Sequence, residues 1–251
     1  MIQILHYNIF NGFGGEEDRI AAFVDYLADH SYDLLALNEY RIEDHRMRQR
    51  LEKIGYSHGI VNTTARAANR SAFFSRRPFK PIFADADFRL VQIEIDGLEL
   101  VNYHASPHGV EAVLQEADRW LSTLKESRNL AVMGDFNSLS WRDEAKFRYD
   151  HPAQAIAARY LRGGKVSYDF IRRLEANGLA DLDDGHSPDN WSIPTAIARP
   201  GEVDWRARID YAFARLDEHH TGSSRVLKEP FFDLLSDHYP VAVSINRSVH
   251  V

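Results

Sequence analysis

Apolar and polar residues recur along this chain with two different periods, and these periods predict its strands and helices. Residues 2–9 alternate as a strand does, and the pattern breaks in a stretch rich in Asn and Gly, residues 8–15. Residues 16–30 then space apolar side chains three and four positions apart, which is typical of a helix. The same helical spacing returns at residues 46–55, 110–124 and 168–176.

Short apolar runs predict the remaining strands. Two runs, residues 88–95 and 98–103, flank Asp96-Gly97, a pair that favours a tight hairpin turn. The other runs are residues 33–37, 59–61, 72–74, 131–134, 208–213 and 240–245. Residues 139–207 are irregular and rich in Asp, Gly and Pro, as segments over a functional face often are. The mixture favours an α/β fold, with sheets covered by helices, over a helical bundle or a barrel.

The composition is that of a globular protein with a sizeable core. Of the 251 residues, 44% are hydrophobic and 12% aromatic. This length predicts a single domain over residues 1–251. The absence of cysteine excludes disulfides, thiolate zinc sites and a cysteine nucleophile. Any metal ion must therefore be held by oxygen or imidazole.

The net charge of −7 narrows the choice of partners. Domains that coat nucleic acid by bulk electrostatics are usually basic, although a nucleic-acid substrate met at a metal centre is compatible with this charge. No run reaches the roughly 18 apolar residues of a membrane-spanning helix, and the opening MIQILHYNIFNG has no basic leader. We therefore expect a soluble, cytoplasmic monomer without stable membrane insertion.

Polar residues suited to chemistry stand where the predicted strands end. They are Asn8, Glu39, His104, Asp135, Asn137, Asp210, Asp237 and His238. Such positions are where α/β proteins place their sites, but Asp and Asn after a strand are also ordinary turn formers. Carboxylates and amides suit a hard divalent ion, with Mg²⁺ first and Mn²⁺ or Ca²⁺ as alternatives. Together with histidine, such an ion can promote the hydrolysis of a phosphate ester.

Six stretches resemble, in order, the motif series of the endonuclease/exonuclease/phosphatase superfamily. They read HYNIFNG, LALNEY, VNYHASPH, VMGDFNS, RIDYAF and LSDHYPV, and the resemblance covers residues 2–246. The superfamily includes pancreatic-type deoxyribonucleases, apurinic-site endonucleases, neutral sphingomyelinases and inositol-polyphosphate 5-phosphatases. The resemblance implies a four-layer α/β sandwich, in which two mixed, mostly antiparallel sheets pack face to face with helices on the outside and the site at one edge.

The resemblance also implies roles for the polar strand ends. Glu39 looks like the principal metal ligand, with Asn8 and Asp237 close to the ion, directly or through water. Asp135 would orient or deprotonate the attacking water. Asn137 would hold that water or a phosphate oxygen.

Three further positions take their roles from the same resemblance. His238 would contact the scissile phosphate, and Asp210 would orient its imidazole. His104 would be a second phosphate-binding or proton-donating imidazole. Residues 68–71 lack the Glu that partners the equivalent histidine in pancreatic-type nucleases, which leaves phosphate binding open to His104. Asn38 stands where the family commonly has Gln, and it keeps an amide.

Several functions fit this reading. We expect a metal-dependent phosphohydrolase that cleaves a phosphodiester or phosphomonoester by metal-assisted attack of water, on a small molecule, a lipid headgroup or a nucleic acid. A deoxyribonuclease or DNA-repair endonuclease is the first alternative, and a catalytically silent binding module on the same fold is the second. The arginines at 66, 70, 76 and 77 either grip a second phosphate or form a solvated basic loop, and we favour the loop.

Overall fold

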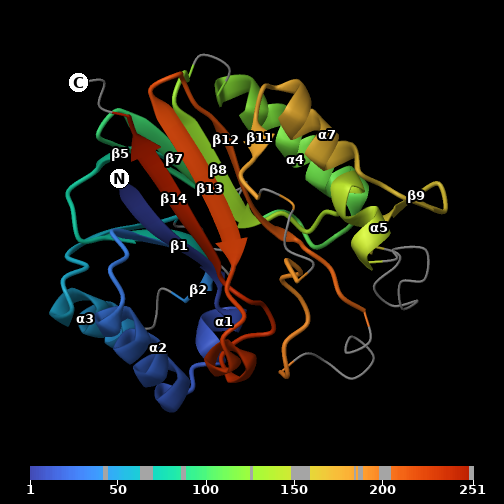
Figure 1. Ribbon diagram of the computed structural model, residues 1–251. Helices are drawn as coiled ribbons and strands as arrows, with labels where there is room; N and C mark the ends of the chain where they lie inside the picture. Colours follow the sequence, from blue (N-terminus) through green and yellow to red (C-terminus); the bar gives the residue numbers. More distant parts are fainter. Residues whose placement is uncertain are drawn as a thin grey trace.

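Two six-stranded sheets form the centre of the computed structural model (Figure 1). The structure describes residues 1–41, 45–62, 70–85, 89–124, 127–147, 159–183, 185, 189–197 and 205–248. The first sheet has the order β13 (His220–Val226), β14 (Val241–Arg247), β1 (Ile2–Asn8), β2 (Leu34–Tyr40), β4 (Arg70–Ser75) and β3 (His58–Val61). The second has the order β11 (Ala180–Asp181), β12 (Asp210–Arg215), β8 (Leu130–Asp135), β7 (Leu98–Tyr103), β6 (Leu90–Ile95) and β5 (Lys80–Asp85).

Both sheets are mixed and mostly antiparallel, as expected. In each sheet one central pair is parallel, β1 with β2 in the first and β7 with β8 in the second. The remaining pairs within the two sheets are antiparallel. Because parallel neighbours end at the same edge, Asn8 lies opposite Asn38 where β1 and β2 finish.

Strand β1 shows how the sequence pattern builds the layers. Its side chains alternate between two cores, since successive residues of a strand point to opposite faces. Ile2 and Ile4 belong to the core between the two sheets. Leu5 and Tyr7 belong to the core on the other face.

Helices cover the outer faces and complete a four-layer sandwich (Figure 1). Helices α2 (Glu17–Asp29) and α3 (His45–Lys53) pack on the first sheet through Phe23 and Met47. Helices α4 (Val110–Leu121) and α7 (Asp169–Ala176) pack on the second. The shorter elements are α1 (Phe10–Phe13), η1 (Ser122–Leu124), η2 (Trp141–Asp143), α5 (Glu144–Phe147), β9 (Leu161–Arg162), β10 (Lys165–Val166) and η3 (Pro230–Leu234).

Among the strands longer than two residues, β13 and β5 were not expected from the sequence, and both are edge strands. Strand β13 reads HTGSSRV, with almost no apolar residue to reveal it, and β5 follows directly after a loop that contains Pro78. An edge strand needs little hydrophobicity, because a single neighbour holds it. The four long helices and the hairpin at Asp96-Gly97 are confirmed.

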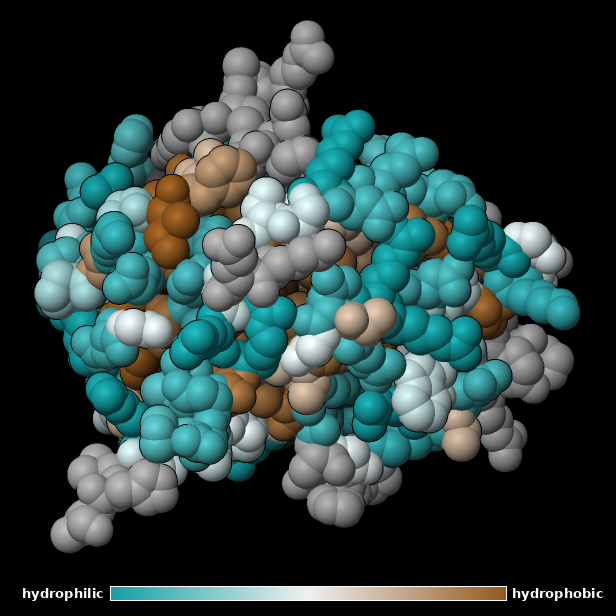
Figure 2. Space-filling view, turned by 90° about the horizontal axis from the view of Figure 1, so that it is seen from above, coloured by the Kyte–Doolittle hydropathy of each residue, from teal (hydrophilic) through white to brown (hydrophobic). Residues whose placement is uncertain are grey.

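The outer surface is largely polar on the face seen from above. Hydrophilic residues predominate there, and hydrophobic residues form small groups between them (Figure 2). Within the described part of the chain, none of the helices combines the length and the apolar character that crossing a membrane requires.

Candidate active site

The eight polar residues expected at strand ends come together at one edge of the sandwich. Both sheets contribute to the cluster. The first sheet brings Asn8, Glu39, Asp237 and His238, and the second brings His104, Asp135, Asn137 and Asp210. Each member lies within 4.0 Å of another member. The site therefore exists only where the two sheets meet.

Asp135 is the most tightly held carboxylate of the cluster. Its Oδ1 accepts from the backbone N–H of Asn137 at 2.9 Å, and its Oδ2 accepts from Nδ2 of Asn8 at 3.0 Å. Its backbone N–H donates to Oδ1 of Asn38 at 2.8 Å. Burial raises the pKa of Asp135, and the nearby imidazole of His238 opposes that rise. A carboxylate that is both fixed and unusually basic is suited to accept a proton from water.

Gly134 explains why a glycine precedes this aspartate. A Cβ built on Gly134 would lie 1.7 Å from the carbonyl oxygen of Tyr103, and Gly134 has φ +154°. Strands β7 and β8 therefore approach too closely at this point for any side chain. The approach brings His104, which follows β7, next to Asp135.

Asp210 lies directly opposite Asp135 on the neighbouring strand β12. Its Oδ2 accepts from Nδ1 of His238 at 2.7 Å, as expected, and its Oδ1 lies 3.1 Å from Nε2 of His6. Burial alone would raise the pKa of Asp210, but the charge and hydrogen bond of His238, together with those of His6, outweigh it and lower that pKa. Burial likewise opposes the charge of His238, whose pKa nevertheless lies well above its usual value because Asp210 and Asp237 face it.

His104 is a neutral imidazole rather than a second cation. Burial lowers its pKa to about 3, and the charges of Arg89 and His238 act in the same direction. Its Nε2 lies 3.6 Å from Oδ2 of Asp135 and 4.0 Å from Oε1 of Glu39. Its buried Nδ1 has no hydrogen-bond partner among the described residues. The sequence has no acid at residues 68–71 that could partner His104. Residues 68 and 69 lie outside the described part of the chain.

Glu39 is aimed into the site by an unusual backbone. It has φ +59°, and the register between β2 and β4 shifts between Leu37 and Tyr40. The adjoining α1 is a left-handed turn, with φ between +41° and +67° from Phe10 to Phe13. This turn directs the backbone N–H of Asn11 to Oε2 of Glu39 at 2.7 Å. Such backbone values are costly and cluster at functional sites.

Glu39 and Asp237 have the character of a cation site. Burial raises the pKa of Glu39, and the charge of Asp237 adds to that effect. Neither carboxylate pairs with Lys or Arg within the ranges that the structure describes. Two carboxylates that repel each other and have no Lys or Arg partner there suit a hard divalent ion, which would relieve their repulsion.

Asn8 and the turn at Asp237 are tied together at the end of β1. Oδ1 of Asn8 accepts from the backbone N–H of Phe10 at 3.1 Å, which leaves one lone pair of that oxygen for a ligand. Ser236 donates its hydroxyl to the carbonyl oxygen of Asn8 at 2.7 Å. The backbone N–H of His238 in turn donates to that hydroxyl oxygen at 3.3 Å. The turn is therefore anchored beside Asn8.

A second group of potential ligand atoms lies deeper in the site. One atom each from Asp135, Asp210 and His238 lie within 4.8 Å of one another. Both oxygens of Asp210 and the Nδ1 of His238 are already engaged in hydrogen bonds with imidazole and carboxylate partners. We therefore regard this group as a proton-handling array, and the Glu39 side as the better place for a metal ion.

The structure also shows site residues that the sequence analysis missed. His6 is one of them, and Arg159 is another, since its Nη1 donates to Oδ1 of Asn137 at 3.3 Å. A third is Ser192, whose hydroxyl oxygen accepts from the backbone N–H groups of Ile209 and Asp210 at 3.0 and 3.1 Å. His6 could have been found from the sequence, because alternate residues of a strand point to the same face, and His6 therefore shares the face of Asn8. The other two lie in parts of the sequence that show no periodic pattern.

Two of the arginines considered as phosphate ligands are engaged away from the site. Arg76 donates to the carbonyl oxygen of Leu27 and stacks on Tyr56, and Arg77 pairs with Asp96. Arg70 begins β4. The arginine at position 66 lies outside the described residues.

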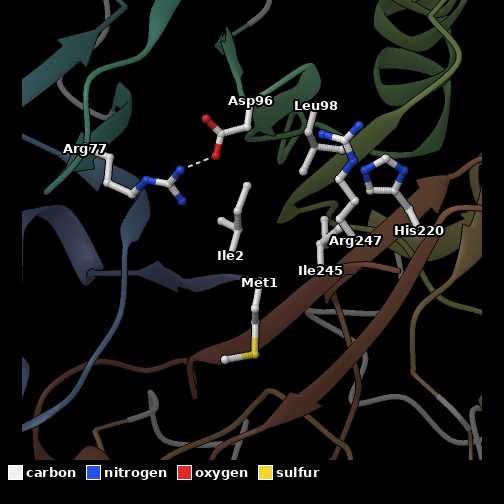
Figure 3. Close-up of a pocket in the computed structure, with 8 residues that line it drawn as sticks. All are labelled: Met1, Ile2, Arg77, Asp96, Leu98, His220, Ile245 and Arg247. Atoms are coloured by element: carbon white, nitrogen blue, oxygen red, sulfur yellow. Dashed lines mark hydrogen bonds and ion pairs between the residues drawn. The ribbon is translucent and has the colours of Figure 1, made fainter. Parts of the chain in front are cut away.

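A cavity of about 390 Å³ lies at the opposite ends of the strands (Figure 3). Its lining comes from the start of β1 at Ile2, the start of β7 at Leu98 and the end of β14 at Ile245. The ion pair between Arg77 and Asp96 closes one side. None of the eight clustered site residues lines this cavity. The candidate site is therefore identified by the side chains that it brings together and not by a cavity.

Comparison with known proteins agrees with this geometry. A model described as the Endonuclease/Exonuclease/phosphatase family matches residues 5–238. None of the curated proteins compared matches the sequence.

Solved structures show the same fold at low sequence identity. An AP endonuclease from Archaeoglobus fulgidus has a TM-score of 0.70 at 17% identity, over 97% of this chain and 99% of its own. A 3'-5' exonuclease from Neisseria meningitidis has a TM-score of 0.69 at 16% identity, over 99% and 100%. ANGEL2, a 2',3'-cyclic phosphatase, has a TM-score of 0.63 at 15% identity, over 97% and 94%.

Proposed function

The chain belongs to the endonuclease/exonuclease/phosphatase family, whose members are metal-dependent hydrolases of phosphate esters, and on that premise we propose how its own residues do this work. The substrate is a phosphodiester or phosphomonoester of modest size, and the ion is Mg²⁺, with Mn²⁺ as a substitute. The observation that carries the proposal is the carboxylate and imidazole array of Asp135, Asp210 and His238 beside Glu39 and Asp237, two carboxylates that repel each other without a Lys or Arg partner among the described residues.

Glu39 and Asp237 would hold the ion, with Asn8 reaching it directly or through water. The repulsion between their charges, with no Lys or Arg partner among the described residues, supports this assignment. When bound, a divalent ion polarises the phosphoryl oxygen and neutralises the charge that develops on it.

Asp135 would take a proton from the attacking water as the water oxygen bonds to phosphorus. The ester P–O bond breaks in the same displacement, and the departing oxygen takes a proton from solvent water and leaves as an alcohol. The raised pKa of its carboxyl makes it a better base than an ordinary aspartate. Asn137 would hold the water or a phosphate oxygen. Its side chain is fixed for this task by donation from Nδ2 to the carbonyl oxygen of Ala105 at 3.2 Å.

His238 would contact the scissile phosphate through its Nε2. Its Nδ1 already donates to Asp210, and the charged form is favoured, so Nε2 carries a proton that can be donated to a phosphate oxygen. His104, being neutral, would donate a hydrogen bond from Nε2 to a substrate or water oxygen. This supports phosphate binding by His104 and not proton donation as an acid.

Hydrolysis of DNA is a second candidate. Two similar structures are named for DNA chemistry, the AP endonuclease and a Neisseria 3' phosphatase bound to a product DNA hairpin. A nuclease of this kind should bind DNA with an affinity that falls steeply with salt, because counterions are released on binding.

A substrate panel tests the proposal. Purified protein with Mg²⁺ or Mn²⁺ would be offered DNA, RNA, bis-p-nitrophenyl phosphate, p-nitrophenyl phosphate, sphingomyelin and inositol phosphates. We expect turnover of at least one ester that chelation by EDTA abolishes. The Asp135→Asn protein, prepared in parallel, controls for contaminating enzymes. Turnover that persists in that variant, or in EDTA, would contradict the proposed function.

A further inference from the structure

His6 is a buried imidazole that joins the two sheets beneath the site. Its side chain is fully buried. Its Nδ1 lies 3.1 Å from the carbonyl oxygen of Ala36, in the neighbouring strand β2, and its Nε2 lies 3.1 Å from Oδ1 of Asp210, in the second sheet. The strand alternation places it on the inner face of β1, in phase with Ile4.

Both ring nitrogens of His6 face hydrogen-bond acceptors. One is the backbone carbonyl oxygen of Ala36, and the other is a carboxylate oxygen of Asp210. An ionised carboxylate only accepts, so Nε2 donates to Asp210. A hydrogen bond to a charged carboxylate is of the stronger kind.

Asp210 is consequently held at two points by two imidazoles. Oδ1 accepts from His6, and Oδ2 accepts from His238 at 2.7 Å. A carboxylate held at one oxygen could still turn about its last torsion, which is broad. The second hold removes that freedom, so Oδ2 stays aimed at Nδ1 of His238.

The orientation of His238 follows from this arrangement. With Nδ1 fixed on Asp210, its Nε2 faces the carboxylates of Asp135 and Asp237, each at 3.9 Å. That space is where the proposed function places the phosphate. A small rotation of the Asp210 carboxylate would therefore move the nitrogen that meets the substrate.

We propose that His6 is a positioning residue for hydrolysis: it fixes Asp210, and Asp210 thereby fixes His238. This inference rests on the proposed phosphate contact of His238. His6 itself touches no substrate, because it is buried below Asp210. A chain without this imidazole would keep its metal ligands and its base but lose the alignment of the phosphate-binding histidine.

The first test needs no turnover. In protein labelled with ¹⁵N-histidine, the proton on Nδ1 of His238 should give a low-field resonance, assigned by its disappearance in Asp210→Asn. We expect His6→Phe, which keeps the volume, and His6→Thr, which suits a strand, both to shift or broaden this resonance. His6→Gln retains an N–H donor and should keep it sharp. An unchanged resonance in both the Phe and Thr variants would overturn the proposal.

The second test is kinetic, on an ester that the wild-type protein hydrolyses. His6→Phe and His6→Thr should lower kcat by about 10- to 100-fold, as lost electrostatic positioning does, while KM changes by less than about threefold. His6→Gln should recover most of the loss. In an Asp210→Asn background, His6→Phe should add less than about a threefold loss, because the two residues act as a unit. Equal losses in both backgrounds would contradict the proposal.

Ile4→Val is the matched control, since Ile4 shares the inner face of β1 but belongs to the apolar core. It should lower the melting temperature without changing kcat or the His238 resonance. A wild-type protein inactive on every ester would contradict the proposed function alone, and the resonance test would then decide the role of His6.

Discussion

Oδ1 of Asn38 accepts a hydrogen bond from the backbone N–H of Asp135 at 2.8 Å, and this bond ties the two sheets together directly under the proposed base. The Nδ2 of the same amide donates to Ser71 and to Asn102 at 3.0 and 2.9 Å. A single buried side chain thus uses its oxygen and both of its protons. Asn102 extends the network to the carbonyl oxygens of Leu37 and Ala72.

Asn38→Leu should therefore weaken folding as well as activity. The change leaves the backbone N–H of Asp135 and the amide oxygen of Asn102 without partners in a dry interior. We expect the free energy of unfolding, measured with urea, to fall by about 2–6 kcal/mol, given about 1–3 kcal/mol for each unsatisfied group. The exposed Asn246→Ala is the control and should stay within about 0.5 kcal/mol of wild type. A variant with normal stability would show that the amide network is dispensable.

Glu39→Gln should weaken the binding of the metal ion. A ligand that binds the folded state raises its melting temperature, so Mg²⁺ should stabilise the wild-type protein and have little effect on the variant. The metal concentration for half-maximal rate should rise at the same time. Glu94→Gln removes a carboxylate from the surface pair with Lys80 and should respond to Mg²⁺ as wild type does. The same thermal response in Glu39→Gln would exclude Glu39 as a ligand.

Asp210 and His238 should behave as one unit. Asp210→Asn removes the charge and keeps the shape, and we expect a rate loss of about 10- to 1000-fold with little effect on folding. His238→Ala should cost at least as much, and the double variant should be far less impaired than the product of the single effects. Multiplicative losses would show that the pair does not work together.

Asp217→Asn provides a matched control for this cycle. Asp217 pairs with Nδ1 of His220 at 2.7 Å, the same distance as the pair in the site, but at an edge strand away from it. We expect the wild-type rate in this variant. A loss comparable to that of Asp210→Asn would mean that breaking any such pair disturbs the fold.

Arg159→Ala should weaken substrate binding more than the chemical step. The exposed guanidinium reaches Asn137, where the phosphate is proposed to bind, so it offers a cation to the substrate. We expect KM to rise by about 10- to 30-fold, the lower part of the range for hydrogen bonds to charged groups, with a smaller change in kcat. Arg162→Ala, which removes a surface cation paired with Glu111 and Asp169, should leave both constants unchanged. An unchanged KM in Arg159→Ala would remove Arg159 from the site.

Arg208→Met should be strongly destabilising. The buried guanidinium pairs with three buried carboxylates, those of Asp143, Asp181 and Asp183. Removing one partner of a buried ion pair leaves uncompensated charge, at a cost of about 3–5 kcal/mol. Arg173→Met disrupts an exposed pair with Asp118 and should cost less than about 1 kcal/mol. Equal effects in the two variants, measured by chemical unfolding, would contradict this account.

The sequence alone predicts the helices and strands whose apolar residues recur at a regular spacing. The apolar face of α4 and the strand before Asp135 are visible because many residues repeat one signal. The edge strand β13 is not, since its side chains have little to bury. The resemblance to a family supplied the pairing of the two sheets, which no local pattern contains.

The same distinction separates the site residues that the sequence predicts from those that it does not. Glu39 and Asp135 follow apolar runs and His238 precedes one, so the sequence marks their positions, and the resemblance suggests their roles. His6 interrupts a strand as an ordinary polar residue would, and its significance depends on Asp210, far away in the sequence. Arg159 approaches Asn137 from a segment whose path no periodicity specifies. Contacts of this kind depend on tertiary packing, which is why they were missed.

The antiparallel pairing of β1 with β14 sets Ile2 opposite Ile245 and has a consequence for the order of folding. Strand β14 is synthesised after every other strand of the two sheets, and Asp237 and His238 directly precede it. The hydrogen bond between His238 and Asp210 can therefore form only after both sheets are otherwise translated. The proposed site is completed when β14 pairs with β1.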